Sequence, residues 1–404
     1  MRKKRIWQKI CGIGAVALFL LAGSTADTAA SRAPLINVGL ETGKSQHTIT
    51  ANAPFMVTDA AGKRVFLKLR SGEKLTVAAG EKGITVNGKA VSSQSIYIQL
   101  DAKAKKGYLD LNGNSYRGNL CVSYRKDKAR LIAMNEVTLE EYLYGVVPNE
   151  MSPSWPTEAL KAQAVAARTF VLHDLKKHAS EGYDVCATTH CQVYRGQKSE
   201  DARTNGAVTA TAGEYLTHNG KAIVSLFHAS GGGHTENSEN VWGQKEPYLR
   251  GVPDYDHHSP SHKWEVKMTL GKLSAVLGNR GKSIGKIRAI NLSKLKNPPV
   301  YEGDRGISGR VRTMAIEGEK GSLLLSGTEA RTLLGLKSTL FDFDKRIFSG
   351  SADEPIVIRG FGFGHGLGMS QWGAKAMAEK GGNKNGLYKK ILEHYYRETE
   401  LKKI

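Results

Sequence analysis

The segment from Val146 to Phe170, VVPNEMSPSWPTEALKAQAVAARTF, most constrains the fold of this chain. Just before it, residues 138–145 begin with a threonine followed three residues later by a glutamate, a capping-box pattern that predicts a short helix. Within the segment, Ser154 predicts the start of a second helix, whose first turn tolerates the proline two residues later. Glu150 therefore falls on a short loop between two helices, a position that can hold one carboxyl group rigidly.

The second predicted helix has a buried side and an exposed side. At about 100° per residue its apolar residues form one stripe, and Gln163 lies near this stripe, where a buried amide needs hydrogen-bond partners. Lys161 and Arg168 share a stripe that faces away from the core. On spacing alone, a solvated face explains these two cations and a surface carboxylate explains Glu150. The apolar stripe consists of Leu160, Ala164, Ala167 and Val171.

The N-terminus predicts export. Residues 1–30 begin with basic side chains and continue with an apolar run from Ile10 to Ala22, which is shorter than the about 20 residues that a membrane-spanning helix needs. The small residues from Ser24 to Ala26 form an acceptable cleavage site. A secretory signal peptide is the main interpretation, and an uncleaved membrane anchor is the alternative. Both place the protein outside the cytoplasm, either secreted to the cell wall or periplasm or anchored at the membrane.

The charge of the chain predicts the kind of surface that it meets. The formal net charge is +20 at pH 7, and five of the positive charges lie in residues 1–26. An exported protein this basic favours anionic surfaces, such as a bacterial cell wall or phospholipid headgroups. Nucleic acid is the general alternative for a basic protein, but export and the absence of a recognisable nucleic-acid motif argue against it.

Short strands dominate residues 31–115. They alternate apolar and polar side chains, and Asn87-Gly88 and Asn112-Gly113 are turn dipeptides that suit hairpins. This region has no catalytic cluster, so we expect a β-rich N-terminal domain with a structural or glycan-binding role. The clearest strands are Val65–Leu69, Leu75–Ala78, Ile84–Val86 and Ile96–Leu100.

Strand and helix patterns mix in residues 116–404. The whole chain is therefore predicted to have an α+β fold, with an α/β subdomain inserted at about residues 262–345. Strands are predicted within 207–229 on both sides of Asn219-Gly220, and at 264–270, 310–317 and 356–359. Helices are predicted at 273–277, 328–334, 370–379 and 386–396.

Two glycine-rich segments have open interpretations. Glycines alternate with other residues from 360 to 368, which excludes a dinucleotide-binding loop, because that loop needs the spacing G-x-G-x-x-G. Alternating glycines instead let one face of an extended strand press against another backbone or a ligand. His365 in the middle either lines a cleft or is a structural histidine. In residues 230–243, Ser230 and Trp242 either contact a sugar or belong to a turn with a core tryptophan.

Cys186, His190 and Cys191 lie close together in DVCATTHCQVYRG. Two thiolates and an imidazole suit zinc. A disulfide between the two cysteines is the alternative outside the cytoplasm, and the spacing alone does not decide between them. The fourth zinc ligand would be His178, His173 or a water molecule.

Five segments of the chain carry motifs, two within the segment Val146–Phe170 and three far from it: PNEM (148–151), EALKAQAVAART (158–169), SGGGHTENSENVWG (230–243), PYLRGVPDYD (247–256) and GFGHGLGMSQWGAKAMA (362–378). In this order they closely resemble the SpoIID/LytB family, the stage II sporulation protein D type of cell-wall protein. The resemblance covers about residues 116–404. In the family, the acid that follows the proline carries lytic transglycosylase activity on peptidoglycan glycan strands, and this acid corresponds to Glu150.

The chemistry of such an enzyme agrees with one isolated acid. Breaking a glycosidic bond needs a carboxylic acid of raised pKa that protonates the leaving oxygen. A hydrolase usually adds a second carboxylate, whereas a transglycosylase can reuse the first to deprotonate the C6 hydroxyl of N-acetylmuramic acid (MurNAc). Glu158 is the nearest second acid to Glu150, and the helix dipole explains its position in a first turn.

The resemblance implies an exported enzyme that cleaves the bond between MurNAc and N-acetylglucosamine (GlcNAc) and leaves 1,6-anhydroMurNAc ends. Part of the family acts on strands already stripped of stem peptides. The resemblance favours zinc at Cys186, His190 and Cys191. We expect His178 as the fourth ligand, a structural role for the metal, and no organic cofactor. Two thiolates would damp the Lewis acidity of the metal, which disfavours a zinc hydrolase. The residues expected to bind substrate are Lys161, Gln163, Arg168, Ser230, Tyr248 and His365.

The same family supplies the alternative function. Some relatives are amidase enhancers, so the chain could be a non-catalytic cell-wall-binding protein that stimulates an N-acetylmuramoyl-L-alanine amidase. An enhancer has no need of an acid at Glu150, so the acid favours the enzyme.

Overall fold

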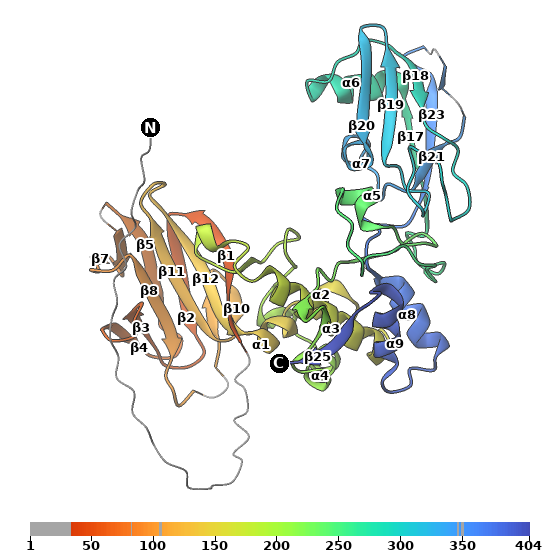
Figure 1. Ribbon diagram of the computed structural model, residues 1–404. Helices are drawn as coiled ribbons and strands as arrows, with labels where there is room; N and C mark the ends of the chain where they lie inside the picture. Colours follow the sequence, from red (N-terminus) through yellow and green to blue (C-terminus); the bar gives the residue numbers. More distant parts are fainter. Residues whose placement is uncertain (1–33, 82, 105–106, 346, 349–350) are drawn as a thin grey trace, which may run out of the picture. The chain divides into compact units, whose positions relative to one another are not determined.

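The computed structural model describes residues 34–404 except 82, 105–106, 346 and 349–350 (Figure 1). The signal peptide or anchor predicted in residues 1–30 lies outside the described residues. Within the described part, every helix is too short or too polar to cross a membrane. Helices and several β-sheets are both present, which confirms the predicted α+β class.

Two sheets share one core in the N-terminal part. The larger sheet has seven strands in the order β13-β1-β12-β11-β8-β3-β4, and the smaller has six in the order β10-β9-β2-β5-β6-β7. Side chains of both sheets alternate between buried and exposed and join one apolar cluster. The strands are β1 Leu35–Lys44, β2 Gln46–Ala51, β3 Phe55–Asp59, β4 Val65–Leu69, β5 Leu75–Gly80, β6 Gly83–Val86, β7 Lys89–Ala90, β8 Ser95–Leu100, β9 Leu109–Leu111, β10 Asn114–Tyr116, β11 Asn119–Arg125, β12 Arg130–Thr138 and β13 Val185–Cys186.

The predicted hairpins are confirmed. Asn87 and Asn112 both have positive φ, 46° and 52°, and each is followed by a glycine of positive φ. This is the left-handed geometry that a tight two-residue turn requires, and asparagine and glycine adopt it at low cost. The same geometry recurs at Asn219 (φ 50°) between β14, Glu214–His218, and β15, Lys221–Ala222.

The boundary predicted between residues 115 and 116 does not separate two sheets. β1 pairs antiparallel with β12 from Leu35↔Thr138 onward, and β11 pairs with β8, so strands from both sides of the predicted boundary belong to one sheet. Sequence patterns describe single strands, whereas the pairing of strands distant in the chain decides where a sheet ends.

Helices begin directly after β12. Thr138 accepts a hydrogen bond from the Glu141 backbone N–H and caps α1, as predicted. α3 begins at Thr157, two residues later than predicted: its N-cap is Pro156, while Ser154 makes no cap bond. The elements of this part are α1 Leu139–Tyr144, α2 Val147–Glu150, α3 Thr157–Asp174, η1 Ala179–Glu181, η2 Gln197–Ser199, α4 Ala202–Ala210, β16 Phe227–His228, α5 Ser238–Trp242, β24 Met369–Ser370, α8 Gln371–Lys380, α9 Leu387–Tyr395 and β25 Glu400–Lys403.

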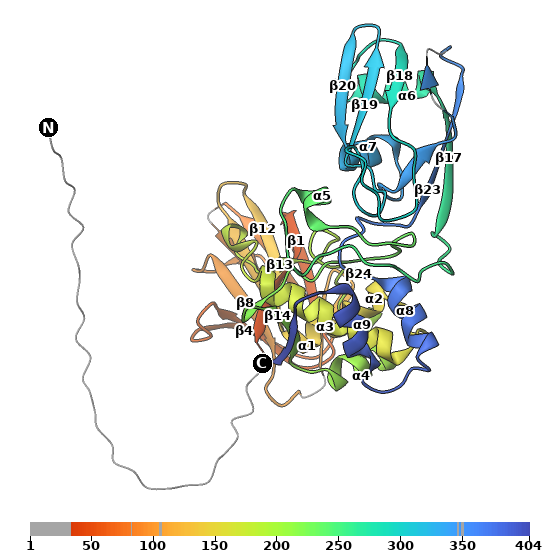
Figure 2. The same cartoon turned by 45° about the vertical axis from the view of Figure 1, so that its right-hand side comes forward.

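α3 is the central helix of this part, and α4, α8 and α9 contact it (Figure 2). Its many alanines, among them Ala162, Ala164 and Ala166, are fully buried and let the neighbouring helices approach closely. Of the region predicted as two strands, residues 207–210 belong to α4 instead, because Asp201 caps a helix there.

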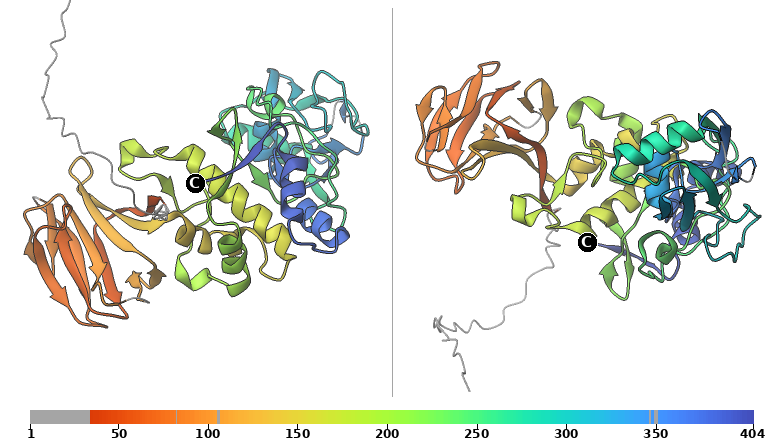
Figure 3. Two further views of the ribbon diagram at one scale, coloured as in Figure 1. Left: turned by 60° about the horizontal axis from the view of Figure 1, so that its bottom comes forward. Right: turned by 90° about the horizontal axis from the view of Figure 1, so that it is seen from above.

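A separate apolar cluster lies in the inserted subdomain, which Figure 3 shows in green to blue. β23 lies in the middle of the sheet β17-β23-β21, so the subdomain extends past the predicted residue 345 to Phe361. The capped helix predicted at 328–334 is α7, with Ser326 as its N-cap. The elements are β17 Lys263–Thr269, α6 Leu270–Asn279, β18 Ile287–Asn291, β19 Thr313–Gly318, β20 Gly321–Ser326, α7 Gly327–Leu334, β21 Phe341–Phe343, β22 Ile347–Phe348 and β23 Pro355–Phe361.

Candidate active-site cleft and cysteine-histidine cluster

A cleft of about 670 Å³ contains Glu150. Its walls come from distant parts of the chain: the end of α2, the last turns of α3, the loop before η2, β16, α5, α7, the glycine-rich segment before α8 and the first residue of α8. A cleft of this size and mixed polarity suits a small ligand or a few sugar units. The lining residues with polar or aromatic side chains are Glu150, Phe170, Asp174, Lys177, Thr189, His190, Cys191, Gln192, Phe227, His228, Trp242, Arg331, His365 and Gln371.

Glu150 is the last residue of α2, a single helical turn. Burial of its carboxyl group raises its pKa above the ordinary value, and two weak hydrogen bonds oppose this effect. The Val193 backbone N–H donates to Oε1 at 3.4 Å, and the Gln371 amide donates to Oε2 at 3.5 Å. The group is thus held by two donors and still favours the protonated form more than an exposed glutamate does.

Gln371 connects Glu150 to the core. It is the first residue of α8, whose N-cap Ser370 accepts a hydrogen bond from the Gly373 backbone N–H. Its amide nitrogen lies 3.4 Å from Oε1 of Gln163, which is fully buried in α3. Gln163 therefore supports Gln371 from behind, and the substrate-binding role predicted for it does not fit this position. Gln371 was not among the predicted site residues, although it lies in the motif GMSQWG.

Asp174 is the other carboxylate that lines the cleft within the described residues. One of its oxygens lies 2.7 Å from Nδ1 of His173, and the other accepts a hydrogen bond from Nζ of Lys177 at 2.8 Å. Both oxygens thus have partners, so Asp174 is poorly placed to activate a water molecule. Of the two carboxylates that line the cleft, Glu150 is the one without a cationic partner in the described part of the chain.

His365 lines the cleft, as one of the two predicted interpretations has it. Its Nδ1 accepts a hydrogen bond from the Leu367 backbone N–H at 3.0 Å. Burial, together with the positive charges of Arg310 and Arg331, lowers the pKa of His365 to about 4. The imidazole is therefore neutral near pH 7, and its ring centroid lies 6.2 Å from that of Trp242, whose side chain is 52% exposed.

The alternating glycines behave as predicted. A Cβ atom at Gly362 would lie 2.6 Å from the Ser230 carbonyl oxygen, and one at Gly364 would lie 2.7 Å from the Cβ of His228. Both glycines also have positive φ, 73° and 112°. The segment before α8 can therefore pass directly beside residues 228–230 only with glycine at these positions.

Lys161 and Arg168 do not line the cleft. Nζ of Lys161 donates to Glu158 at 2.7 Å and to the Asn385 side chain at 2.8 Å. Arg168 is fully buried and forms a two-pronged pair with Glu140, at 2.8 and 2.6 Å. Both cations have protein partners, so the structure places neither of them in the cleft where substrate-binding side chains were predicted.

Ser230 and Tyr248 are also buried away from the cleft. The Ser230 hydroxyl donates to Asp256, whose carboxylate also accepts the backbone N–H groups of Gly232 and Gly233 at 2.8 and 2.9 Å. The hydroxyl of Tyr248 lies 3.5 Å from the Val224 backbone nitrogen. The glycine-rich turn at 230–233 is therefore fixed by a buried aspartate, and the substrate-binding roles predicted for these two side chains do not fit their positions.

Replacing Arg168 with methionine should lower stability rather than glycan affinity. The change leaves Glu140 without its partner, and breaking a buried ion pair costs on the order of 3 kcal/mol. We expect a lower midpoint in urea unfolding and unchanged glycan binding of the folded protein. Wild-type stability combined with lost binding would return Arg168 to the substrate site.

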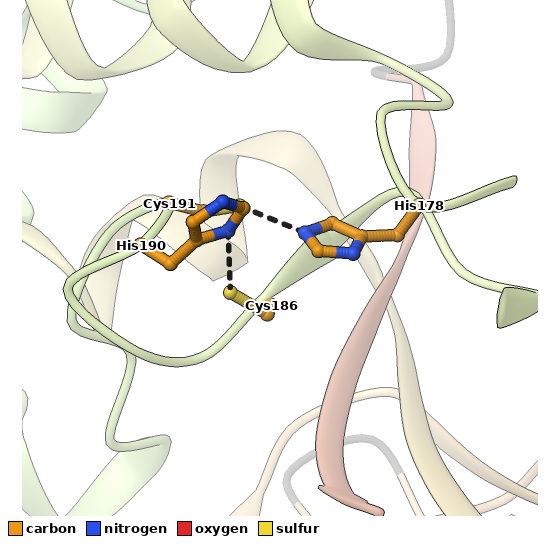
Figure 4. Close-up of side chains that lie close together, drawn as sticks. All are labelled: His178, Cys186, His190 and Cys191. Carbon is orange, nitrogen blue, oxygen red and sulfur yellow. Dashed lines mark hydrogen bonds between the residues drawn. The ribbon is translucent and has the colours of Figure 1, made fainter. Parts of the chain in front are cut away.

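Four potential metal ligands lie close together (Figure 4), and two of them, His190 and Cys191, line the cleft. One ligand atom from each of His178, Cys186, His190 and Cys191 lies within 4.8 Å of all the others. Sγ of Cys186 is 3.7 Å from Nδ1 of His190, and Sγ of Cys191 is 3.5 Å from Nε2 of His178. The two thiols are free. Of the two histidines considered as the fourth ligand, His178 lies in the cluster, whereas His173 pairs with Asp174.

The dimensions of this cluster fit zinc. Bonds of about 2.3 Å to sulfur and about 2.0 Å to nitrogen place these two atoms roughly 3.5 Å apart in a tetrahedron. The sulfur-to-nitrogen distances of 3.5, 3.7 and 3.8 Å are close to this value. Nδ1 of His178 also lies 2.6 Å from Glu181, the carboxylate contact that commonly orients a metal-bound imidazole.

Comparison with known proteins identifies the family to which this chain belongs. Residues 127–218 match the family model described as stage II sporulation protein. Stage II sporulation protein D of Bacillus subtilis is 31% identical over 288 residues, which cover 67% of this chain and 76% of that protein. The chain belongs to the stage II sporulation protein D family, as the motifs predicted.

Two further relatives extend the similarity. An uncharacterised protein of Brachyspira hyodysenteriae is 32% identical over 371 residues, covering 91% of this chain and 92% of that protein. The amidase enhancer of Bacillus subtilis is 32% identical over 346 residues and covers 76% of this chain. This match covers 47% of the enhancer, so the chain spans about half of its length. Residues 244–368, including the inserted subdomain, match a domain of unknown function (DUF8618).

Proposed function

We propose that this protein is an exported lytic transglycosylase that cleaves the MurNAc–GlcNAc bond of peptidoglycan. The observation that carries the proposal is Glu150, a half-buried acid of raised pKa in a cleft whose other carboxylate, Asp174, is already paired with Lys177. Membership of the stage II sporulation protein D family supports a role at the cell wall.

The proposed reaction needs one carboxyl group. Protonated Glu150 donates its proton to the glycosidic oxygen as the bond to the MurNAc C1 breaks, and GlcNAc leaves with a hydroxyl group. The resulting carboxylate then removes the proton of the MurNAc C6 hydroxyl, whose oxygen bonds to C1. Glu150 ends protonated, the product carries a 1,6-anhydro ring, and no water is consumed.

The other groups in the cleft would bind and orient the sugar. Trp242 offers an exposed ring for stacking against a sugar face, beside the neutral imidazole of His365. Gln371 holds the Glu150 carboxyl group from the direction of the core. These contacts fix the acid relative to the sugar, which is how positioning contributes to catalysis.

We further propose that His178, Cys186, His190 and Cys191 hold a structural zinc ion. The ion would supply order to the loop rather than reaction chemistry. The same loop contributes Val193, whose backbone N–H contacts Glu150, and Cys191 and His190 line the cleft. Ordering the loop would therefore also order one wall of the proposed active site.

The proposed place of action is outside the cytoplasm, at the cell wall. The net charge of +20 suits contact with anionic wall or membrane surfaces.

The similarity to a protein named amidase enhancer favours a second candidate, a wall-binding partner of an amidase. An assay with a purified amidase separates the two. If the protein is an enhancer, wild type and Glu150→Gln stimulate the amidase equally. If it is an enzyme, wild type releases glycan fragments without any amidase.

The pH profile tests the role of Glu150. The acid must be protonated to donate, so kcat/KM should fall as the pH rises through its raised pKa. Replacing Gln371 with leucine removes a donor that lowers this pKa, so the fall should move to higher pH. Initial rates on stripped glycan between pH 4 and pH 8 give this measurement. A rate that rises with pH over the interval where Glu150 ionises would contradict the assignment.

A further inference from the structure

Arg331 is a cation of the cleft that the proposed reaction does not use. It lies in the last turn of α7, in the inserted subdomain, and lines the cleft together with Glu150 and His365. Lys177, the other basic side chain there apart from histidine, is paired with Asp174. Among the described residues, no carboxylate forms an ion pair with Arg331, and its one hydrogen bond is from Nε to the Leu336 carbonyl oxygen at 3.3 Å.

The side chain of Arg331 is held in place. Gly335 follows α7 as its C-cap in the left-handed conformation (φ 63°), and the Leu336 N–H donates back to the Arg331 carbonyl at 2.9 Å. The guanidinium contacts the same turn through Nε. Its two terminal nitrogens have no hydrogen-bond partner within the described part of the chain. A half-buried guanidinium whose position is fixed and whose terminal donors are free can bind an anion.

The helix is also connected to the wall of the cleft. The Gly364 backbone N–H donates to the Lys337 carbonyl at 3.0 Å, and Ser338 forms a β-bridge with Gly364. The chain that follows α7 is therefore fixed to the residue just before His365. This attachment keeps Arg331 on the wall of the cleft that also carries His365.

We propose that Arg331 binds a carboxylate carried by the MurNAc unit of the substrate and thereby selects the glycan strand that Glu150 cleaves. This inference rests on the proposed function and deepens it. A guanidinium pairs with a carboxylate through two parallel hydrogen bonds. The muramyl unit offers two sources: the lactyl carboxylate, which is free when the stem peptide has been removed, and the carboxylates of the stem peptide when it is present.

Three substrates separate these sources. The first is amidase-stripped glycan, with free lactyl carboxylates. The second is the same glycan with those carboxylates converted to methylamides, and the third is intact peptidoglycan. The enzymes are wild type, Arg331→Gln, Arg331→Lys and the control Arg288→Gln. Arg288 is an exposed arginine on β18 of the same subdomain, outside the cleft.

If Arg331 binds the lactyl carboxylate, Arg331→Gln loses about 10- to 100-fold in kcat/KM on stripped glycan, the range for losing a hydrogen-bonded charge pair. On the methylamide glycan, which wild type already cleaves slowly, Arg331→Gln lowers kcat/KM little further. Arg331→Lys keeps part of the preference, and Arg288→Gln matches wild type. A loss confined to intact peptidoglycan identifies the stem peptide as the source. Melting curves identify any variant that is merely unfolded.

Binding provides a readout that does not need cleavage. In a Glu150→Gln background, adding Arg331→Gln should weaken binding of stripped glycan fragments by a similar factor, measured by the fluorescence of the tryptophans. The proposal would be overturned if Arg331→Gln and Arg288→Gln had the same kcat/KM on all three substrates. It would also be overturned if Arg331→Gln lost as much kcat/KM on the methylamide glycan as on stripped glycan. Failure of wild type to cleave any substrate would refute the proposed reaction, while the binding comparison would still test Arg331.

Discussion

Replacing Glu150 with glutamine should reduce cleavage of stripped glycan by at least about 100-fold, and up to about 10⁴-fold, the range for losing a general acid. The amide keeps the size of the side chain but cannot donate the proton to the glycosidic oxygen or later accept one from the C6 hydroxyl. Glycan binding should be retained. Val193 and Gln371 each donate to one oxygen of Glu150, and a glutamine at this position still has one of these oxygens. Initial rates and fragment binding together measure this result.

Asp174→Asn is the comparison for this variant. A hydrolase with two catalytic acids would lose activity in both variants, whereas a transglycosylase needs Glu150 alone. Asp174 already gives its two oxygens to His173 and Lys177, so we expect at most a modest loss from its replacement. Cleavage by Glu150→Gln at the wild-type rate would remove Glu150 from the mechanism, and equal loss of binding and cleavage would make it a binding residue.

Removing a ligand from the cysteine-histidine cluster should have the second large effect. We expect wild type to bind about one zinc per chain and His178→Gln or Cys191→Ser to bind far less. Because metal-binding free energy adds to the stability of the structure that holds the metal, these variants and chelator-treated wild type should melt at lower temperature. Activity should fall as well, since the loop carries the Val193 N–H that contacts Glu150.

His173→Gln is the matched control for His178→Gln. His173 lies near the same loop, but it pairs with Asp174 outside the cluster, so its replacement should leave the metal content unchanged. Elemental analysis and thiol titration make the measurement. Metal-free wild type with no titratable thiol at Cys186 and Cys191 would support a disulfide and contradict the zinc site.

The sequence was most informative where the structure is local. The turns at Asn87 and Asn112 depend on two adjacent residues whose backbone conformation suits a hairpin, so they could be read directly. The candidate metal ligands lie within one stretch of 14 residues, from His178 to Cys191, and their chemistry indicated their proximity. Each of these features needs only short-range information.

The sequence was least informative where a partner lies far away in the chain. Arg168 has the helical spacing of a solvated or ligand-binding cation, but Glu140, 28 residues earlier, captures it in the core. The Ser230 hydroxyl likewise donates a hydrogen bond to a distant residue, Asp256, which lies 26 residues later in the chain. Arg331 was missed because nothing near it in the sequence resembles a site, and only the fold brings it to the cleft of Glu150. Pairing of charges therefore decides which cations remain available for a ligand.

The most direct test of the proposed reaction is mass spectrometry of the products from purified peptidoglycan, both intact and amidase-treated, incubated with wild type and with Glu150→Gln. The proposed mechanism predicts glycan fragments that end in 1,6-anhydroMurNAc with wild type and none with Glu150→Gln. Reducing MurNAc ends would contradict it, because they would require a water molecule and a second catalytic acid. No fragments from either substrate would also contradict it and would favour the amidase-enhancing role.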